Sequence, residues 1–150
     1  MPSTSGLPRI VPAVSADRPA VHDLLRRSGL TLDGLDEHAA TLLVAREEGR
    51  VVATAALEAY GSAVLLRSVA VDAAHRGRGL GQALTHAALD AARQAGARHV
   101  YLLTETAEAF FARLGFRAVP RSEVAPAVRQ SVEFTSACPA SARVMLLDLA

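Results

Sequence analysis

The segment Arg76-Gly77-Arg78-Gly79-Leu80-Gly81 decides the fold because of what stands on either side of it. It follows an apolar, strand-like run from Val64 to Val71 and precedes an apolar, helix-like run from Leu80 to Ala95. A strand, a glycine-rich turn and a helix start in this order form a binding site for a phosphorylated cofactor. The free N–H groups of the first helical turn point at the anion, and the helix dipole favours negative charge there.

The residue types within this segment suit a phosphate group. Gly79 and Gly81 let the backbone come close to a ligand because no Cβ stands in the way, and Gly77 can adopt a positive φ. Arg76 and Arg78 add donors that match phosphate geometry. The alternative interpretation is a glycine-rich turn that only joins a strand to a helix.

The glycine spacing excludes two other nucleotide-binding motifs. Glycines at 77, 79 and 81 read G-x-G-x-G, which differs from the dinucleotide fingerprint G-x-G-x-x-G. No Lys follows any of these glycines, so the segment is not a P-loop. The spacing Arg-x-x-Gly-x-Gly at 76, 79 and 81 resembles the pyrophosphate loop of the GNAT superfamily of N-acetyltransferases, which implies that coenzyme A is the cofactor.

Composition sets the class of protein. The 150 residues are 51% hydrophobic and 4% aromatic, so we expect a core of Ala, Val and Leu in one domain over 9–150, after a flexible N-terminal segment over 1–8. A formal charge of +1 argues against a nucleic-acid-binding protein. We expect no membrane span and no signal peptide, and therefore a cytoplasmic protein. The five histidines show no metal-ligand spacing, so no metal site is predicted.

Periodicity and turn residues divide the chain into alternating elements. Helices are expected after a cap at Ser15 or Asp17 up to Gly29, from Leu80 to Gly96 and over 107–114, and the connection over 31–38 has room for a short helical turn. The segment 122–134 is interpreted as a helix or an ordered loop. Strands are predicted over 9–14, 41–46, 51–60, 63–71, 100–104, 116–119 and 143–149.

This order of elements matches the fold of the GNAT superfamily. The resemblance implies a single-domain α/β fold whose mixed, twisted sheet of about seven strands splays between its fourth and fifth strands and is flanked by helices. The cofactor is expected in the opening. Parallel neighbours joined through the Leu80 helix would obey the right-handed crossover rule.

Two segments carry the cofactor resemblance, Leu66 to Gly81 and Tyr101 to Phe116. It implies that the first strand lends its backbone to the pantetheine arm, that the loop amides hold the pyrophosphate, and that the second segment packs beside the thioester. The cofactor-binding residues expected from it are Val69, Ala70, Val71, Arg76, Gly77, Arg78, Gly79, Leu80, Gly81, Gln82, Thr104 and Phe111.

The chain departs from the superfamily at the residue expected to protonate the leaving thiolate. Many members have Tyr-x-x-x-Gly-Phe, whereas this chain has Phe111, and a phenyl ring donates no proton. Many members also have Asn seven residues earlier, where this chain has Thr104. The departure puts the general acid in doubt, but neither the fold nor the cofactor.

Three segments resemble the acetyltransferase-like branch encoded with arsenic-resistance genes: 102–107, 131–134 and 138–142. This resemblance implies a small amino-acid-like substrate, for example a phosphinothricin analogue or the arsenical amino acid arsinothricin. Cys138 is the one cysteine. Since thiophilic metalloids bind through two or three thiolates, direct arsenite sequestration is not expected.

Acetyl transfer to an amine requires a positioned thioester, a neutral amine and stabilisation of the developing oxyanion. We expect a backbone N–H at a bulge near Val69 to Val71 to polarise the thioester carbonyl. The candidates for a carboxylate that accepts the amine proton are Glu105, Glu58 and Glu133, each of which has a solvated surface carboxylate as its alternative. The candidate partners for an acidic amino-acid substrate are Arg67, Arg121 and Arg129, with a surface arginine as the alternative for each.

The resulting prediction is an acetyl-CoA-dependent N-acetyltransferase that acts on a small amine by direct transfer in a ternary complex. Cys138 is not expected to carry the acyl group, and a homodimer is left open. The alternative is a catalytically silent CoA-binding sensor or interaction module, for which Phe111 is the motivating residue. Acetylation of a protein N-terminus or lysine would need an acidic groove, and the sequence has no acidic cluster to form one.

Overall fold

The computed structural model describes residues 7–137 and 141–149, and within these ranges it contains one seven-stranded sheet. The strands follow the order β1-β2-β3-β4-β5-β7-β6, and every neighbouring pair is antiparallel except β4 and β5. Their bounds are β1 (Ile10–Pro12), β2 (Ala39–Glu47), β3 (Arg50–Tyr60), β4 (Ala63–Val71), β5 (His99–Thr104), β6 (Arg117–Ala118) and β7 (Arg143–Asp148).

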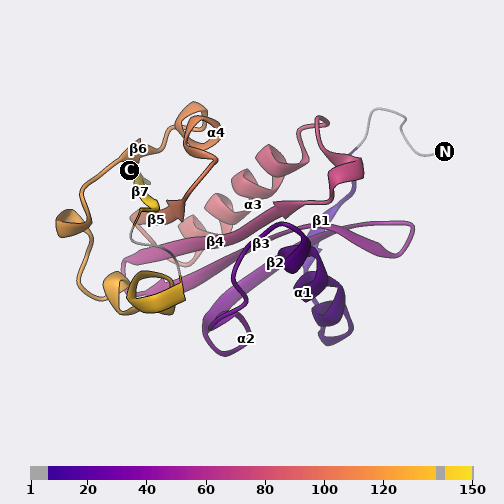
Figure 1. Ribbon diagram of the computed structural model, residues 1–150, viewed down its shortest axis with the longest axis horizontal. Helices are drawn as coiled ribbons and strands as arrows, with labels where there is room; N and C mark the ends of the chain where they lie inside the picture. The colour runs from indigo at the N-terminus through magenta and orange to yellow at the C-terminus, as the bar shows by residue number, and fades with distance from the viewer. Residues whose placement is uncertain (1–6, 138–140, 150) are drawn as a thin grey trace.

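Helices connect and cover these strands (Figure 1). The α-helices are α1 (Arg18–Arg27), α2 (Leu35–His38), α3 (Leu80–Gln94) and α4 (Glu108–Arg113). Short helical turns are η1 (Ser15–Asp17), η2 (Ala73–His75), η3 (Arg121–Glu123), η4 (Val128–Gln130) and η5 (Glu133–Ala137). The predicted order of strands and helices is confirmed. The segment 122–134, interpreted as a helix or an ordered loop, is the second of these, an ordered loop with short helical turns.

Local sequence accounts for the antiparallel part of the sheet. The turn between β2 and β3 places Glu48 and Gly49 at φ 54° and 77°, the paired positive values of a type I′ hairpin. Long apolar runs in β3 and β4 are buried on both faces, since helices cover both. Ala53 and Ala55 of β3 belong to the core under α3, whereas Ala56 belongs to the core under α1.

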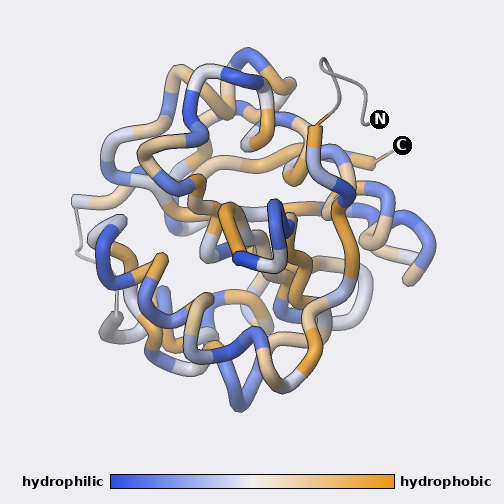
Figure 2. The backbone as a smooth tube through the Cα atoms, turned by 90° about the vertical axis from the view of Figure 1, so that its right-hand side faces the viewer, coloured by the Kyte–Doolittle hydropathy of each residue, from blue (hydrophilic) through white to orange (hydrophobic). Residues whose placement is uncertain are grey.

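Hydropathy along the backbone follows this layering. Figure 2 shows hydrophobic stretches along the inner strands and hydrophilic stretches mainly at the outer turns. α3 buries Leu84, Ala88 and Ala92, spaced four residues apart on one helical face. This packing fixes the start of α3 at the end of β4. It thereby also fixes the segment Arg76 to Gly81, which we call the glycine segment.

The sheet opens between β4 and β5. Only three residue pairs join them, Ala63 with His99, Val64 with Val100 and Leu65 with Tyr101. Beyond these pairs β4 continues to Val71 and β5 to Thr104 without pairing to each other. The predicted splay between the fourth and fifth strands is confirmed, and it leaves one edge of β4 available to a ligand.

A β-bulge deforms β4 at the point where the strands separate. Arg67 pairs with Ala56 and Ala70 pairs with Thr54, so Ser68 and Val69 together face only Ala55. Ser68 has φ 60°, in the left-handed region that non-glycine residues rarely adopt. The bulge therefore changes the direction of the strand at Ser68.

Among the described residues, no helix is long and apolar enough to cross a membrane. The same residues contain no group of three His, Cys, Asp or Glu side chains arranged to hold a metal ion. Residues 1–6 and Cys138 lie outside the described part of the chain. The flexible segment over 1–8 and the single domain over 9–150 therefore stay predictions.

Candidate active site

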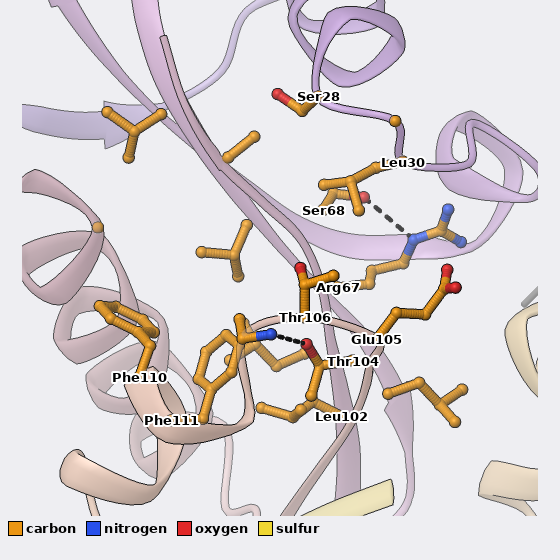
Figure 3. A pocket seen from close by; sticks show the side chains of 18 of the residues that line it. Ser28, Leu30, Arg67, Ser68, Leu102, Thr104, Glu105, Thr106, Phe110 and Phe111 are labelled. Atoms are coloured by element: carbon orange, nitrogen blue, oxygen red, sulfur yellow. Dashed lines mark hydrogen bonds between the residues drawn. The ribbon is translucent and has the colours of Figure 1, made fainter. Parts of the chain in front are cut away.

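A cavity of about 740 Å³ occupies the opening between β4 and β5. We call it the central cavity. One end is formed by the glycine segment and the start of α3, and the other by Arg67, Ser68, Glu105 and Glu133, together with the loop 28–31 that follows α1. We call the second part the acceptor end. Figure 3 shows side chains from both flanks of the opening directed into this space.

The glycine segment presents a helix N-terminus to the cavity. Gly77 and Gly79 have φ 83° and 84°, and Gly79 is the N-cap residue of α3. The first helical hydrogen bond of α3 runs from the Ala83 N–H to the Gly79 carbonyl at 3.0 Å. Within the described residues, the N–H groups of Leu80, Gly81 and Gln82 have no backbone acceptor, so they are available to an anion.

Charged side chains fix the shape of this segment. Arg76 Nε donates to the Val71 carbonyl at 3.1 Å, which ties the segment to the end of β4. Arg78 forms an ion pair with Glu47 at 3.3 Å. His75 lies 3.2 Å from Glu47 and 3.1 Å from Asp72. The Arg78 side chain is therefore directed toward the β2–β3 hairpin.

Next to the acceptor end lies a hydrogen-bonded cluster of three charged residues and two hydroxyl residues: Glu58, Arg67 and Glu133, with Tyr60 and Ser131. The Arg67 side chain is fully buried, and its Nη1 donates to Glu58 Oε2 at 2.7 Å. Its Nε lies 3.2 Å from Glu133 Oε2. A single arginine thus faces two buried carboxylates.

Further hydrogen bonds hold Glu58 ionised. Burial alone would raise the pKa of Glu58, but hydrogen bonds from Tyr60, Arg67 and Ser131 outweigh burial and lower it below its ordinary value. Ser131 Oγ donates to Glu58 Oε1 at 2.7 Å. Burial, followed by the bond to Glu58, raises the pKa of Tyr60 to about 12, so Tyr60 stays protonated and donates.

Glu133 differs from Glu58 because fewer groups stabilise its charge. Burial raises the pKa of Glu133 to about 7; the charge of Arg67 opposes this rise and the charge of Glu58 adds to it. The carboxylate lines the central cavity and exchanges its proton near neutral pH. Both properties suit a group that accepts a proton from a bound molecule.

Two distant parts of the chain meet at Arg67. Its Nη2 donates to the Thr31 carbonyl at 3.3 Å, in the loop between α1 and α2. Gly34, with φ 74°, packs so closely against Val132, the residue before η5, that a Cβ built on Gly34 would lie 2.6 Å from Val132 Cγ1. Figure 1 shows the turn around 133–137 beside this loop. Arg67 therefore joins both walls of the acceptor end.

The structure brings most of the predicted site residues together. Every predicted cofactor-binding residue except Arg78 lines the central cavity, as do Arg67, Glu105 and Glu133. Glu58 is not one of the described lining residues, but it forms an ion pair with Arg67, which is. Among the described lining residues neither Arg121 nor Arg129 occurs. Arg121 instead contacts the Phe134 ring and the Ala142 carbonyl.

Phe111 lies at the border of the cavity and the core. It is buried, and its ring packs edge-to-face against Phe110 and Phe116 at centroid distances of 5.0 and 5.7 Å. Thr104 Oγ1 accepts the Ala107 N–H at 3.0 Å, which begins the turn into α4. These two residues therefore shape the cavity wall and supply no acidic proton.

Sequence reasoning missed several residues of the site. Ser68, Tyr60 and Ser131 had no assigned role, although Tyr60 stands two residues after Glu58 on the same strand face. The loop 28–31 was also missed as a wall of the cavity. The burial of Glu58, whose alternative in the sequence was a solvated surface carboxylate, could have been found from its position among the apolar residues of β3, since a carboxylate buried there must be paired.

Most of the chain matches a known protein family. The model of the acetyltransferase (GNAT) family matches residues 11–116. The chain belongs to the GNAT acetyltransferase family. It is therefore an acetyltransferase that uses acetyl-CoA, and its splayed sheet is the GNAT fold. No curated protein matches the chain.

Solved structures of other proteins share this fold. Rv2747 from Mycobacterium tuberculosis, solved in complex with CoA, is 28% identical, with a TM-score of 0.80 over 95% of this chain and 100% of that one. N-acetylglutamate synthase from Neisseria gonorrhoeae, complexed with coenzyme A and N-acetyl-glutamate, is 20% identical with a TM-score of 0.82. That match covers 97% of this chain and only 36% of the synthase.

A third GNAT structure is YhbS from Escherichia coli, in complex with CoA. It is 23% identical, with a TM-score of 0.73 over 100% of this chain and 86% of that one. At this identity, as for the synthase, the likeness concerns the fold alone. The family match ends at residue 116, so it does not include Ser131 and Glu133. The contacts of the acceptor end are therefore described from the residues of this chain.

Proposed function

We propose that the protein transfers the acetyl group of acetyl-CoA to the amine of a small, amino-acid-like molecule by direct transfer in a ternary complex. The observation that carries this proposal is Glu133, a buried carboxylate with a pKa near 7 that lines the same cavity as the glycine segment. An amine must lose a proton to react, and Glu133 is held where it can accept one.

The other end of the central cavity, formed by the glycine segment and the start of α3, fits coenzyme A, and we call it the cofactor end. A pyrophosphate needs convergent N–H donors and close backbone approach, which the start of α3 and the open space at Gly77 and Gly79 provide. The unpaired edge of β4, including Val69 and Val71, offers backbone groups to the pantetheine arm. When bound, acetyl-CoA supplies a thioester. Its reaction with an amine yields an amide and the free thiol of coenzyme A.

Glu133 acts as the general base in this proposal. Arg67 and Ser131 hold it: the guanidinium lies 3.2 Å from its carboxylate and the Ser131 hydroxyl accepts its backbone N–H at 3.3 Å. Glu58 is the less suitable base because Arg67, Tyr60 and Ser131 already occupy its oxygens. Glu105 stays the second candidate, since it lines the cavity with an exposed side chain.

The bulge of β4 supports positioning of the acetyl group. One residue of the pair Ser68 and Val69 has no partner in β3, so a backbone N–H there is free to polarise the thioester carbonyl. Phe111 donates no proton to the leaving group. We propose that the thiolate leaves unassisted, because a thiol with an ordinary pKa of about 8.5 is a tolerable leaving group near neutral pH.

The narrower prediction of an arsenical or phosphinothricin analogue as substrate, in arsenic or xenobiotic resistance, rests on sequence resemblance alone. Arg67 is the predicted cation that the described cavity lining includes for an acidic group. The described cavity lining includes neither Arg121 nor Arg129. These arginines would contact such a substrate only if its acidic group extended out of the cavity.

A thiol-release assay with purified protein tests the proposal. Acetyl-CoA is offered with glutamine, glutamate, lysine, phosphinothricin, arsinothricin, spermidine and an aminoglycoside, and a no-amine reaction supplies the Cys138 background. Turnover with an amino acid, lost in Glu133→Gln but kept in Glu105→Gln, is the expected result. CoA binding without turnover on any amine would favour the silent sensor, the function that the buried Phe111 suggests.

A further inference from the structure

The charged groups of the acceptor end are unbalanced. Glu58, Glu105 and Glu133 are three carboxylates, and Arg67 is the one cation that the described residues place among them. Figure 3 shows the Glu105 carboxylate and the Arg67 guanidinium directed to the same end of the cavity. Even with Glu133 protonated, the negative charges outnumber the positive one.

Arg67 has little capacity left for an anionic substrate. Its Nη1 donates to Glu58, its Nη2 to the Thr31 carbonyl and its Nε to Ser68 Oγ, and its charge is offset by two carboxylates within 3.2 Å. A substrate acid group that approached Arg67 would also approach Glu133. Like charges in a partly desolvated site repel, so such a group would weaken binding.

Neutral donors are nevertheless present at this end. The hydroxyls of Ser28, Ser68 and Thr106 belong to residues that line the cavity. The Ser68 hydroxyl accepts from Arg67 and keeps its own proton to donate. These hydroxyls can donate hydrogen bonds to one carboxylate, such as the α-carboxylate of a zwitterion, although they carry no positive charge. A second acid group on the substrate would find no cation to pair with.

From this charge balance, and resting on the proposed function, we infer that the acetyl acceptor is an α-amino acid whose side chain is uncharged or cationic. Amino acids with an acidic side chain, among them glutamate, phosphinothricin and arsinothricin, are poor acceptors. Glu105 is the specificity-determining residue, because its exposed carboxylate lines the acceptor end and has no hydrogen-bond or ion-pair partner among the described residues.

Glutamine and glutamate provide the test because they have nearly the same shape and differ in charge. The kcat/KM of each is measured by thiol release with saturating acetyl-CoA at one pH, with acetylated product identified by mass. One uncompensated like-charge contact predicts a kcat/KM for glutamate lower by about tenfold or more. Lysine is expected to match or exceed glutamine.

Two variants separate the role of Glu105 from a general charge effect. Glu105→Gln is expected to lower the ratio of kcat/KM for glutamine to kcat/KM for glutamate several-fold. Glu123→Gln removes an exposed carboxylate outside the described cavity lining and is expected to leave the ratio unchanged. Glu105→Lys is expected to favour glutamate.

The inference is overturned if glutamate is acetylated as well as glutamine or better, or if Glu105→Gln and Glu123→Gln have the same effect on the ratio. In both cases amino-acid acetylation itself stands. Absence of turnover with every amine is a different result: it overturns the proposed function, and the inference with it.

Discussion

Replacing Glu133 by glutamine is expected to stabilise the protein at alkaline pH while removing most of its activity. Glu133 is buried, and its pKa is raised from the ordinary 4.5 to about 7. The difference corresponds to about 3 kcal/mol, the free energy that the folded protein loses when this carboxyl group ionises. Glutamine has nearly the same shape and never ionises.

The sign follows from the direction of the shift. A raised pKa means that the folded state holds the proton more tightly than the unfolded chain does. The stabilisation is therefore complete below about pH 4.5 and is lost as the pH rises to about 7. Relative to Glu133→Gln, the natural protein should be about 1 kcal/mol less stable at pH 5 and about 3 kcal/mol less stable at pH 8.

Thermal unfolding followed by circular dichroism at both pH values measures this difference. For a chain of this length about 3 kcal/mol raises Tm by about 6–12 °C at pH 8, and the gain should shrink at pH 5. Glu105→Gln is the matched control, because it neutralises an exposed carboxylate of the same cavity and should change Tm little.

Activity should change in the opposite direction. Loss of a general base costs about a hundredfold or more in kcat/KM, and the rise of kcat/KM with pH through about 7 should disappear in Glu133→Gln. Arg67 and Glu58 are the groups whose charges act on this carboxylate, and both remain in the variant. A Glu133→Gln protein that is no more stable than the natural one at pH 8, or that keeps the natural pH profile, would refute the reasoning.

Three further substitutions test other parts of the structure. Arg67→Met leaves two buried carboxylates without their cation and should cost about 3–5 kcal/mol in urea unfolding at neutral pH, less at pH 4. Gly81→Ala places a Cβ at ordinary distances inside a helix, so Tm should hold or rise while calorimetry shows weaker CoA binding; equal CoA affinity would contradict close cofactor approach here. Gly34→Ala should cost about 3 kcal/mol, because its Cβ would lie 2.6 Å from Val132 Cγ1 at a positive φ; an unchanged Tm would show that this contact can relax.

The cofactor end could be predicted from the sequence because it is local. The residues from Leu66 to Gln82 form a strand, a turn and a helix start in one continuous stretch, and their spacing alone indicates the chemistry. The splay followed from the resemblance of the element order to a known fold. The bulge was expected near Val69 to Val71 and lies at Ser68 and Val69, since register depends on the opposing strand.

The acceptor end could not be predicted in the same way because it depends on contacts between distant residues. Ser131 donates to Glu58 across 73 positions of sequence, and no periodicity encodes that bond. The sequence assigns Arg67 to the substrate, whereas in the folded protein three of its five N–H groups donate to Glu58, Ser68 and Thr31. Sequence reasoning favoured Glu105 over Glu133, because the burial that raises the pKa of Glu133 arises only in three dimensions.

The short contact between β4 and β5 has a consequence for how such a protein can change. The three residue pairs that hold these strands together lie at the closed end of the opening, and none of their six residues lines the central cavity. The cofactor-binding region is formed mainly by the continuous stretch 69–82, whereas the acceptor end is assembled from the loop 28–34, Arg67, Glu105 and residues 131–137. Mutations in the scattered segments can therefore alter the choice of amine without disturbing coenzyme A. For a laboratory seeking a new acceptor, randomised libraries belong in the loop 28–34, at Glu105 and in residues 131–137, with residues 69–82 held constant.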